Sequence, residues 1–204
     1  MPWLTAIVLA AGSSQRMESR NKLLLDFGGK PLVAHVVKTI VAAGLEEVVV
    51  VVGHEANRVR NVLVPYPVTF VHNERYPEGM STSIHAGVNA ASEEAAGYMI
   101  CLADLPLIEP AELRVLIRAF NAALEQDDRH IVVPYHAGER GNPVVFPVYY
   151  KPAILAQRGL MGCRGLIEQH RDHVVAVEME TDHILVDIDT PEAYLGLRND
   201  LKHP

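Results

Sequence analysis

Five consecutive valines at positions 48–52 limit the folds open to this chain of 204 residues more than any other feature. A run with no polar side has no face to turn to water, so it predicts a strand over residues 47–53 that is buried on both faces. Strands of this kind occur in parallel sheets that helices cover on both sides. The run therefore predicts a parallel strand inside an α/β fold.

Apolar strand-like runs alternate with segments of helical period along most of the chain, which is the pattern of parallel strands joined by crossover helices. Besides the valine run, strands are predicted over residues 5–10, 68–73, 97–104 and 130–135, and helices over 31–44, 83–95 and 110–126. Pro31 suits the first position of a helix, and Gly44 suits the position just past a helix end. The alternation predicts a three-layer fold with a mostly parallel, Rossmann-like sheet.

The pattern of Gly and Pro residues between the predicted elements changes beyond residue 135. Residues 138–147 are predicted as an antiparallel or edge strand, because prolines lie toward its ends. Short helices over 151–157 and 164–170, strands over 174–179 and 183–188, and a helix over 190–200 complete the pattern. Because no repeat and no linker rich in Gly, Ser or Pro interrupts it, one domain over residues 1–204 is expected.

The net charge and the cysteine content limit which ligands and which kinds of site are expected. The formal net charge of −7 argues against non-specific binding to nucleic acid or to an anionic membrane. An anionic ligand would therefore need a local basic pocket. Cys101 and Cys163 lack the spacing of a zinc or redox motif and are predicted to be packing residues. No apolar run reaches the ~18 residues of a membrane span, and no leader-like segment is evident, so a cytoplasmic location is expected.

The first strand leads directly into LAAGSSQRM, residues 9–17. Loops at the carboxyl ends of parallel strands are where such sheets bind ligands. Small side chains let backbone N–H groups approach an anion, and Arg16 and Lys22 add two cations within reach of a polyphosphate. The stretch therefore predicts a phosphate site, although an ordinary turn with two solvated basic residues is the simpler alternative.

Two common nucleotide-binding patterns are absent from this loop. GxxxxGK[ST] does not occur, and GxGxxG is excluded because Gly12 is the only glycine between Ala6 and Asn21. These absences weaken the hypotheses of a P-loop ATPase and of a dinucleotide-binding redox domain.

LAAGSSQRM followed by NKLLLDFGGKPL resembles the signature of nucleotidyltransferases with the MobA-like fold, and within them the branch that includes molybdenum cofactor cytidylyltransferase. VVVGHEANRVR, GMSTSIHAG, CLADLPLI, RGNPVVFP and DIDTPEAY are similar to segments of that branch in the same order, from about residue 5 to 195. The resemblance implies a GT-A-like nucleotidyltransferase topology. It also implies Mg²⁺-dependent transfer of NMP, with CTP favoured as donor, to a phosphate-bearing acceptor such as molybdopterin.

The resemblance further implies which residues bind the nucleotide. The Gly12 loop and Arg16 would hold the β- and γ-phosphates, Lys22 would stabilise charge near the α-phosphate, and Gly79 with the Ser83 hydroxyl would contact the base. The implied nucleotide-binding residues are Leu9, Ala10, Ala11, Gly12, Arg16, Lys22, Gly79 and Ser83, with Arg16, Lys22 and Asp104 as the catalytic set.

Mg²⁺ prefers hard oxygen ligands and usually takes one or two protein carboxylates. Asp104 follows a strand that should end at the same sheet edge as the Gly12 loop, although from local sequence alone it could equally be a turn residue. The resemblance implies a metal ligand. Asp189 is the expected second ligand, with Asp187 as the alternative, and Asp189 could instead cap the following helix.

Three positions depart from the family pattern. His85 stands where the cytidylyltransferase branch is expected to carry arginine, Leu160 stands where an aspartate is expected, and Glu18 stands where a glycine commonly follows Arg-Met. A solvated loop position tolerates Glu18, whereas the first two departures leave the acceptor open. The alternatives are the same chemistry with GTP, UTP or ATP as donor and another phosphorylated acceptor, and a non-catalytic nucleotide sensor.

Overall fold

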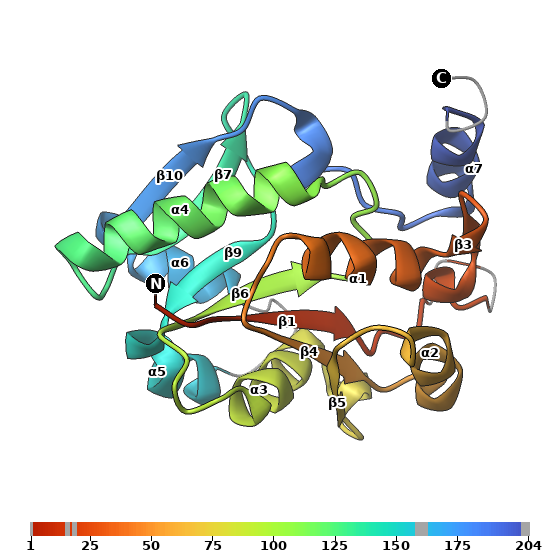
Figure 1. Ribbon diagram of the computed structural model, residues 1–204, viewed down its shortest axis with the longest axis horizontal. Coiled ribbons are helices and arrows are strands. Elements are labelled where there is room, and N and C mark those ends of the chain that lie inside the picture. Colours follow the sequence, from red (N-terminus) through yellow and green to blue (C-terminus); the bar gives the residue numbers. More distant parts are fainter. Residues whose placement is uncertain (1, 15–16, 18–19, 158–162, 201–204) are drawn as a thin grey trace.

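A computed structural model describes residues 2–14, 17, 20–157 and 163–200 (Figure 1). Over these residues an eight-stranded sheet has the order β10-β7-β9-β6-β1-β4-β5, with β8 paired to β7. Its strands are β1 Leu4–Ala10, β4 Glu47–Val52, β5 Thr69–His72, β6 Gly97–Leu102, β7 Ile131–His136, β8 Glu139–Arg140, β9 Val144–Pro147 and β10 Val174–Glu178, and a small hairpin joins β2 Asp26–Phe27 to β3 Lys30–Pro31.

Helices cover both faces of this sheet. They are α1 Leu32–Ala42, α2 Ala56–Leu63, α3 Met80–Ala90, α4 Pro110–Gln126, α5 Lys151–Ala156, α6 Arg164–Gln169 and α7 Pro191–Asp200. One apolar core lies under α1, α2 and α4, and a second lies under α3, α5 and α6 on the opposite face (Figure 1). The predicted three-layer, mostly parallel α/β fold is confirmed.

The valine strand β4 lies between β1 and β5 and is parallel to both, as predicted. Val48, Val50 and Val52 pack into the first core and Val51 into the second, so the run serves both faces of the sheet. This double burial explains why no polar residue interrupts it.

Strand β9 lies inside the sheet, antiparallel to both β6 and β7, so of the two alternatives the edge position was wrong. Pro143 precedes the strand and Pro147 is its last residue. Neither proline therefore removes an N–H group from the middle of the ladder.

Residues 183–188 were predicted to form a strand, and this prediction was wrong. The segment begins in a 3₁₀ turn, Asp182–Ile184, and continues without regular structure. Ile184 and Ile188 are both buried in the core, so the apolar spacing serves packing outside the sheet. The backbone N–H of Ile188 donates to the carbonyl of Asp104 at 3.1 Å, which holds the segment beside the loop after β6.

Helix α4 spans the predicted residues, whereas α3 lies three to five residues before its predicted position at each end. Helix α7 begins at Pro191, and the Thr190 hydroxyl accepts the N–H of Ala193 at 3.2 Å, so Thr190 caps the helix. Among the described residues, no helix is both long and apolar enough to cross a membrane.

Candidate active site

A cleft of about 480 Å³ opens where β1 and β6 end. It is built from the loop after β1, the turn before α3, the loop after β6 and the segment before α7. Its lining residues are Leu9, Ala11, Gly12, Ser13, Ser14, Lys22, Leu23, Tyr76, Pro77, Gly79, Met80, Ser83, Leu102, Asp104, Asp187 and Asp189. Most of the residues predicted to bind nucleotide and metal therefore surround one space.

The loop after β1 turns its small residues toward the cleft. A Cβ atom added to Gly12 would meet nothing within 4 Å, so a ligand can approach the backbone there. Ser14 has a φ of 51°, and its hydroxyl accepts the backbone N–H of Lys22 at 3.1 Å. The loop is thus folded back onto the segment that carries the lysine.

Five of the positions that the sequence singled out are missing from this lining, three of them because they lie outside the described residues. The side chain of Ala10 is buried in the core beneath the cleft, so only its backbone could serve a ligand. His85, on α3, does not line the cleft either. Arg16 lies outside the described residues, as do Glu18 and Leu160.

Lys22 forms the electrostatic centre of the cleft. Its Nζ lies 2.5 Å from Oδ2 of Asp104 and 2.6 Å from Oδ1 of Asp189. Burial works to lower the pKa of Lys22, but the two carboxylates outweigh it and raise that pKa above its usual value. The lysine is therefore a fixed positive charge at neutral pH, and it holds together two loops that are distant in the sequence.

Asp104, Asp187 and Asp189 each bring one carboxylate oxygen to within 4.8 Å of the others, and among the described residues they form a cluster that could hold a metal ion. Partial desolvation, together with the charges of Asp189 and Asp104, raises the pKa of Asp187. Such crowding of like charges calls for a cation. The oxygen-only ligand set suits Mg²⁺ or Mn²⁺. The Lys22 ammonium, which pairs with Asp104 and Asp189, shows that this position stabilises positive charge.

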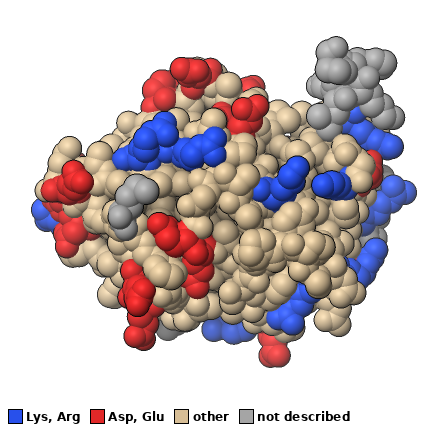
Figure 2. Space-filling view, in the orientation of Figure 1, with Lys and Arg blue, Asp and Glu red and all other residues tan. Residues whose placement is uncertain are grey.

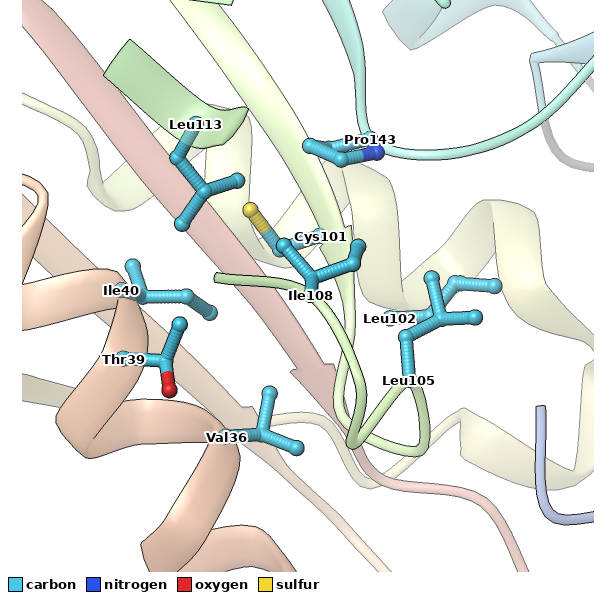
Figure 3. Close-up of a pocket in the computed structure, with 9 residues that line it drawn as sticks. All are labelled: Val36, Thr39, Ile40, Cys101, Leu102, Leu105, Ile108, Leu113 and Pro143. Carbon is cyan, nitrogen blue, oxygen red and sulfur yellow. The ribbon is translucent and has the colours of Figure 1, made fainter. Parts of the chain in front are cut away.

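The loop that carries Asp104 packs against apolar side chains of the core. Leu105 and Ile108 line a pocket of only about 10 Å³ together with Val36 of α1 and Leu113 of α4. Figure 3 shows these side chains around it. The pocket is too small for a ligand and is part of the core. Cys101, which faces it, is a buried packing residue as predicted, and burial raises the pKa of its thiol.

Replacing Leu105 with Ala is expected to lower the free energy of unfolding by about 2–4 kcal/mol, because a side chain only 4% exposed leaves a cavity. Affinity for Mn²⁺ is expected to fall as well, because Asp104 is the neighbouring residue. Leu116→Ala, in the same core but away from the cleft, is the matched control. Urea unfolding and Mn²⁺ titration check both variants, and equal loss of Mn²⁺ affinity in the two would refute a specific role for Leu105.

The turn before α3 forms another part of the cleft wall. The Asn73 amide donates to the hydroxyl oxygens of Thr82 and Ser83, each at 2.9 Å, which fixes the start of the helix. Gly79, with a φ of 117°, is the N-cap of α3. Ser83 and the backbone at Gly79 therefore stand in a fixed arrangement at the cleft wall.

Sequence reasoning missed Tyr76, together with Pro77, Met80, Leu23 and Leu102. Tyr76 packs over Gly53, where an added Cβ would lie 2.8 Å from the Tyr76 ring and 2.9 Å from the Ala11 Cβ. The glycine after the valine strand could have signalled such a close approach, but it does not identify the partner.

Charge is unevenly distributed over the surface. On the face in Figure 2, basic side chains predominate toward the right-hand edge, around α2 and α7, and acidic ones toward the left and top. The arrowhead of β1 points toward that right-hand edge in Figure 1. On this face, basic side chains therefore lie on the side toward which β1 points, although the net charge of the chain is −7.

Comparison with known proteins gives one family model, the MobA-like NTP transferase domain, which matches residues 6–174. Nicotine blue oxidoreductase of Paenarthrobacter nicotinovorans is 29% identical and covers 94% of this chain and 95% of its own length. Bifunctional protein GlmU of Leifsonia xyli is 36% identical over 58% of this chain, which corresponds to 25% of the GlmU length.

Among solved structures, Rv0371c of Mycobacterium tuberculosis H37Rv is similar, with a TM-score of 0.82, 25% identity and 97% of both chains covered. A manganese complex of Rv0371c has a TM-score of 0.79, 24% identity, and coverage of 97% of this chain and 98% of that one. The shared fold therefore extends over nearly the whole chain, and a divalent metal binds one protein that has it.

Proposed function

The chain belongs to the family of MobA-like NTP transferases, and from this premise we propose that it transfers NMP from CTP to a phosphate-bearing acceptor. The proposed acceptor is molybdopterin, the proposed cofactor is Mg²⁺, and pyrophosphate is the second product. The observation that carries the proposal is the convergence of Asp104, Asp187 and Asp189 beside Lys22 at the mouth of a cleft.

In this proposal the backbone of the Gly12 loop and Arg16 bind the β- and γ-phosphates, and Lys22 binds near the α-phosphate. Asp104 and Asp189 hold Mg²⁺, with Asp187 as the alternative ligand. When bound, the cation neutralises charge on the triphosphate and on the departing pyrophosphate.

Lys22 has two sets of partners in this scheme. Before the nucleotide binds, its ammonium pairs with Asp104 and Asp189. A triphosphate offers the lysine new oxygen partners while the carboxylates turn to the cation. Because the attacking phosphate of the acceptor is already ionised at neutral pH, the chain needs no general base for the transfer. The lack of a catalytic histidine among the residues that line the cleft is consistent with this chemistry.

The donor is tested by calorimetric titration with CTP, GTP, UTP and ATP, each with and without Mg²⁺. CTP is expected to bind at least about tenfold more tightly than the other three, and only with Mg²⁺, since one well-placed polar contact to a base is worth a factor of this size. Asp104→Asn is the control, in which the Mg²⁺-dependent part of binding should disappear. A preference for GTP would change the donor, and failure to bind any triphosphate would overturn the proposal.

A second candidate function comes from the relative that matches along most of this chain, nicotine blue oxidoreductase. On that analogy the cleft would hold a redox dinucleotide in place of a triphosphate. The three clustered carboxylates argue against this candidate, because they would repel a pyrophosphate that brings no cation. Titration with NADH and NADPH in the absence of metal distinguishes the two functions. The redox function predicts that these dinucleotides bind, and the nucleotidyltransferase function predicts that they do not.

A further inference from the structure

Glu112, on the first turn of α4, lies outside the cleft but contacts both segments that carry the clustered aspartates. We propose that it is a positioning residue that sets the separation of Asp104 from Asp187 and Asp189. The role of this positioning in metal binding rests on the proposed function. The contacts of Glu112 that carry the inference do not depend on that function.

On one side, Glu112 is tied to the loop that carries Asp104. Its Oε2 accepts the backbone N–H of Glu109 at 2.7 Å, and the Glu109 side chain in turn accepts from the backbone at position 112, which forms a capping box at the start of α4. Only residues 105–108 separate this cap from Asp104, and Leu105 and Ile108 among them are buried. The carboxylate of Glu112 is therefore fixed relative to the Asp104 loop.

On the other side, Glu112 binds the segment that leads to Asp187 and Asp189. The Thr181 hydroxyl donates to its Oε1 at 2.5 Å, and Nδ1 of His183 lies 3.0 Å from its Oε2. The Glu112 and His183 side chains are 14% and 26% exposed, so water competes only partly for these bonds. One carboxylate thus joins two segments about 70 residues apart in the sequence.

The hydrogen bonds of Glu112 oppose the repulsion among the three clustered aspartates. Three carboxylates within 4.8 Å repel one another, and no strand pairing holds the segment at 183–188 in place. Its other backbone anchors are the carbonyl of Ile184, which accepts from Asn142, and the N–H of Ile188, which donates to Asp104. Without Glu112, the start of the segment would lose two of the bonds that oppose the repulsion, and the ligand set would open.

The test compares Glu112→Ala with Glu109→Ala, which weakens the same helix cap but leaves the bonds to Thr181 and His183 in place. Mn²⁺ affinity is measured by electron paramagnetic resonance, and hydrogen exchange is followed over residues 181–190. Glu112→Ala is expected to weaken Mn²⁺ binding about 10–100-fold, the usual effect of removing a group that orients metal ligands, and to speed exchange in the segment. Glu109→Ala should match the wild type in both, and Glu112→Gln should recover part of the affinity.

The outcomes separate this inference from the proposed function. Wild-type protein that binds no Mn²⁺ would contradict the metal site, and the exchange rates would then decide whether Glu112 positions the segment. Unchanged exchange in Glu112→Ala would overturn the positioning role, as would an equal loss of Mn²⁺ affinity in both alanine variants, because helix capping alone would then explain it.

Discussion

Asp104→Asn is expected to reduce nucleotidyl transfer by about 1000-fold or more while leaving the fold intact. The substitution removes one of the three negative charges that would attract the cation, and that cation would neutralise the triphosphate. Asparagine has nearly the same shape as aspartate. The backbone carbonyl at position 104 also keeps its bond to Ile188 N–H, so the segment before α7 stays in place.

The free energy of unfolding of Asp104→Asn is expected to stay within about 1 kcal/mol of the wild type, because Lys22 keeps its pair with Asp189 and the like-charge repulsion is relieved. Asp182→Asn is the control, since Asp182 is exposed and lies in the same segment as the two other aspartates but outside the cleft. Pyrophosphate release and urea unfolding are the measurements. Turnover within tenfold of the wild type would remove Asp104 from the metal site.

The sequence allowed the sheet edge of the site to be predicted because strand ends follow a simple rule. β1 and β6 are neighbouring parallel strands, so the loops after them must meet at one edge. The sequence therefore predicted a shared sheet edge for the Gly12 loop and Asp104, and the pairing of β1 with β6 then brings the two loops side by side. The family resemblance added Asp189 and Asp187. Their expected strand does not exist, and long-range contacts of Ile184 and Ile188 hold them in the cleft instead.

Other parts of the site depend on contacts that no local pattern contains. Glu109 and Glu112 have the spacing of a capping box, and the sequence predicted the helix that they begin, but the bonds of Glu112 to Thr181 and His183 are visible only in three dimensions. The position of Tyr76 similarly depends on its contact with Gly53. Sequence patterns predict which elements form, whereas the packing between distant elements decides which side chains complete the cleft.

Lys22→Met is expected to have opposite effects on metal and nucleotide. Without nucleotide, the variant should bind Mn²⁺ more tightly than the wild type, because the ammonium no longer competes for Asp104 and Asp189. With CTP present, turnover should fall by about 100–1000-fold, since a cation that stabilises developing charge on the phosphates is lost. If Lys22 only stabilised the fold, the substitution would lower Mn²⁺ affinity and turnover together.

The same variant should depend on metal for its stability. Removing Lys22 leaves two partly buried carboxylates without their cation, which should cost about 2 kcal/mol, between the values for exposed and buried ion pairs. Mn²⁺ should restore most of this loss, so the metal-induced rise in melting temperature should be larger in Lys22→Met than in the wild type. Lys38→Met, at an exposed position of α1, is the matched control and should behave as the wild type does. A metal-induced rise no larger than that of the wild type would mean that Lys22 and the cation do not share the carboxylates, and the proposed exchange of partners would be wrong.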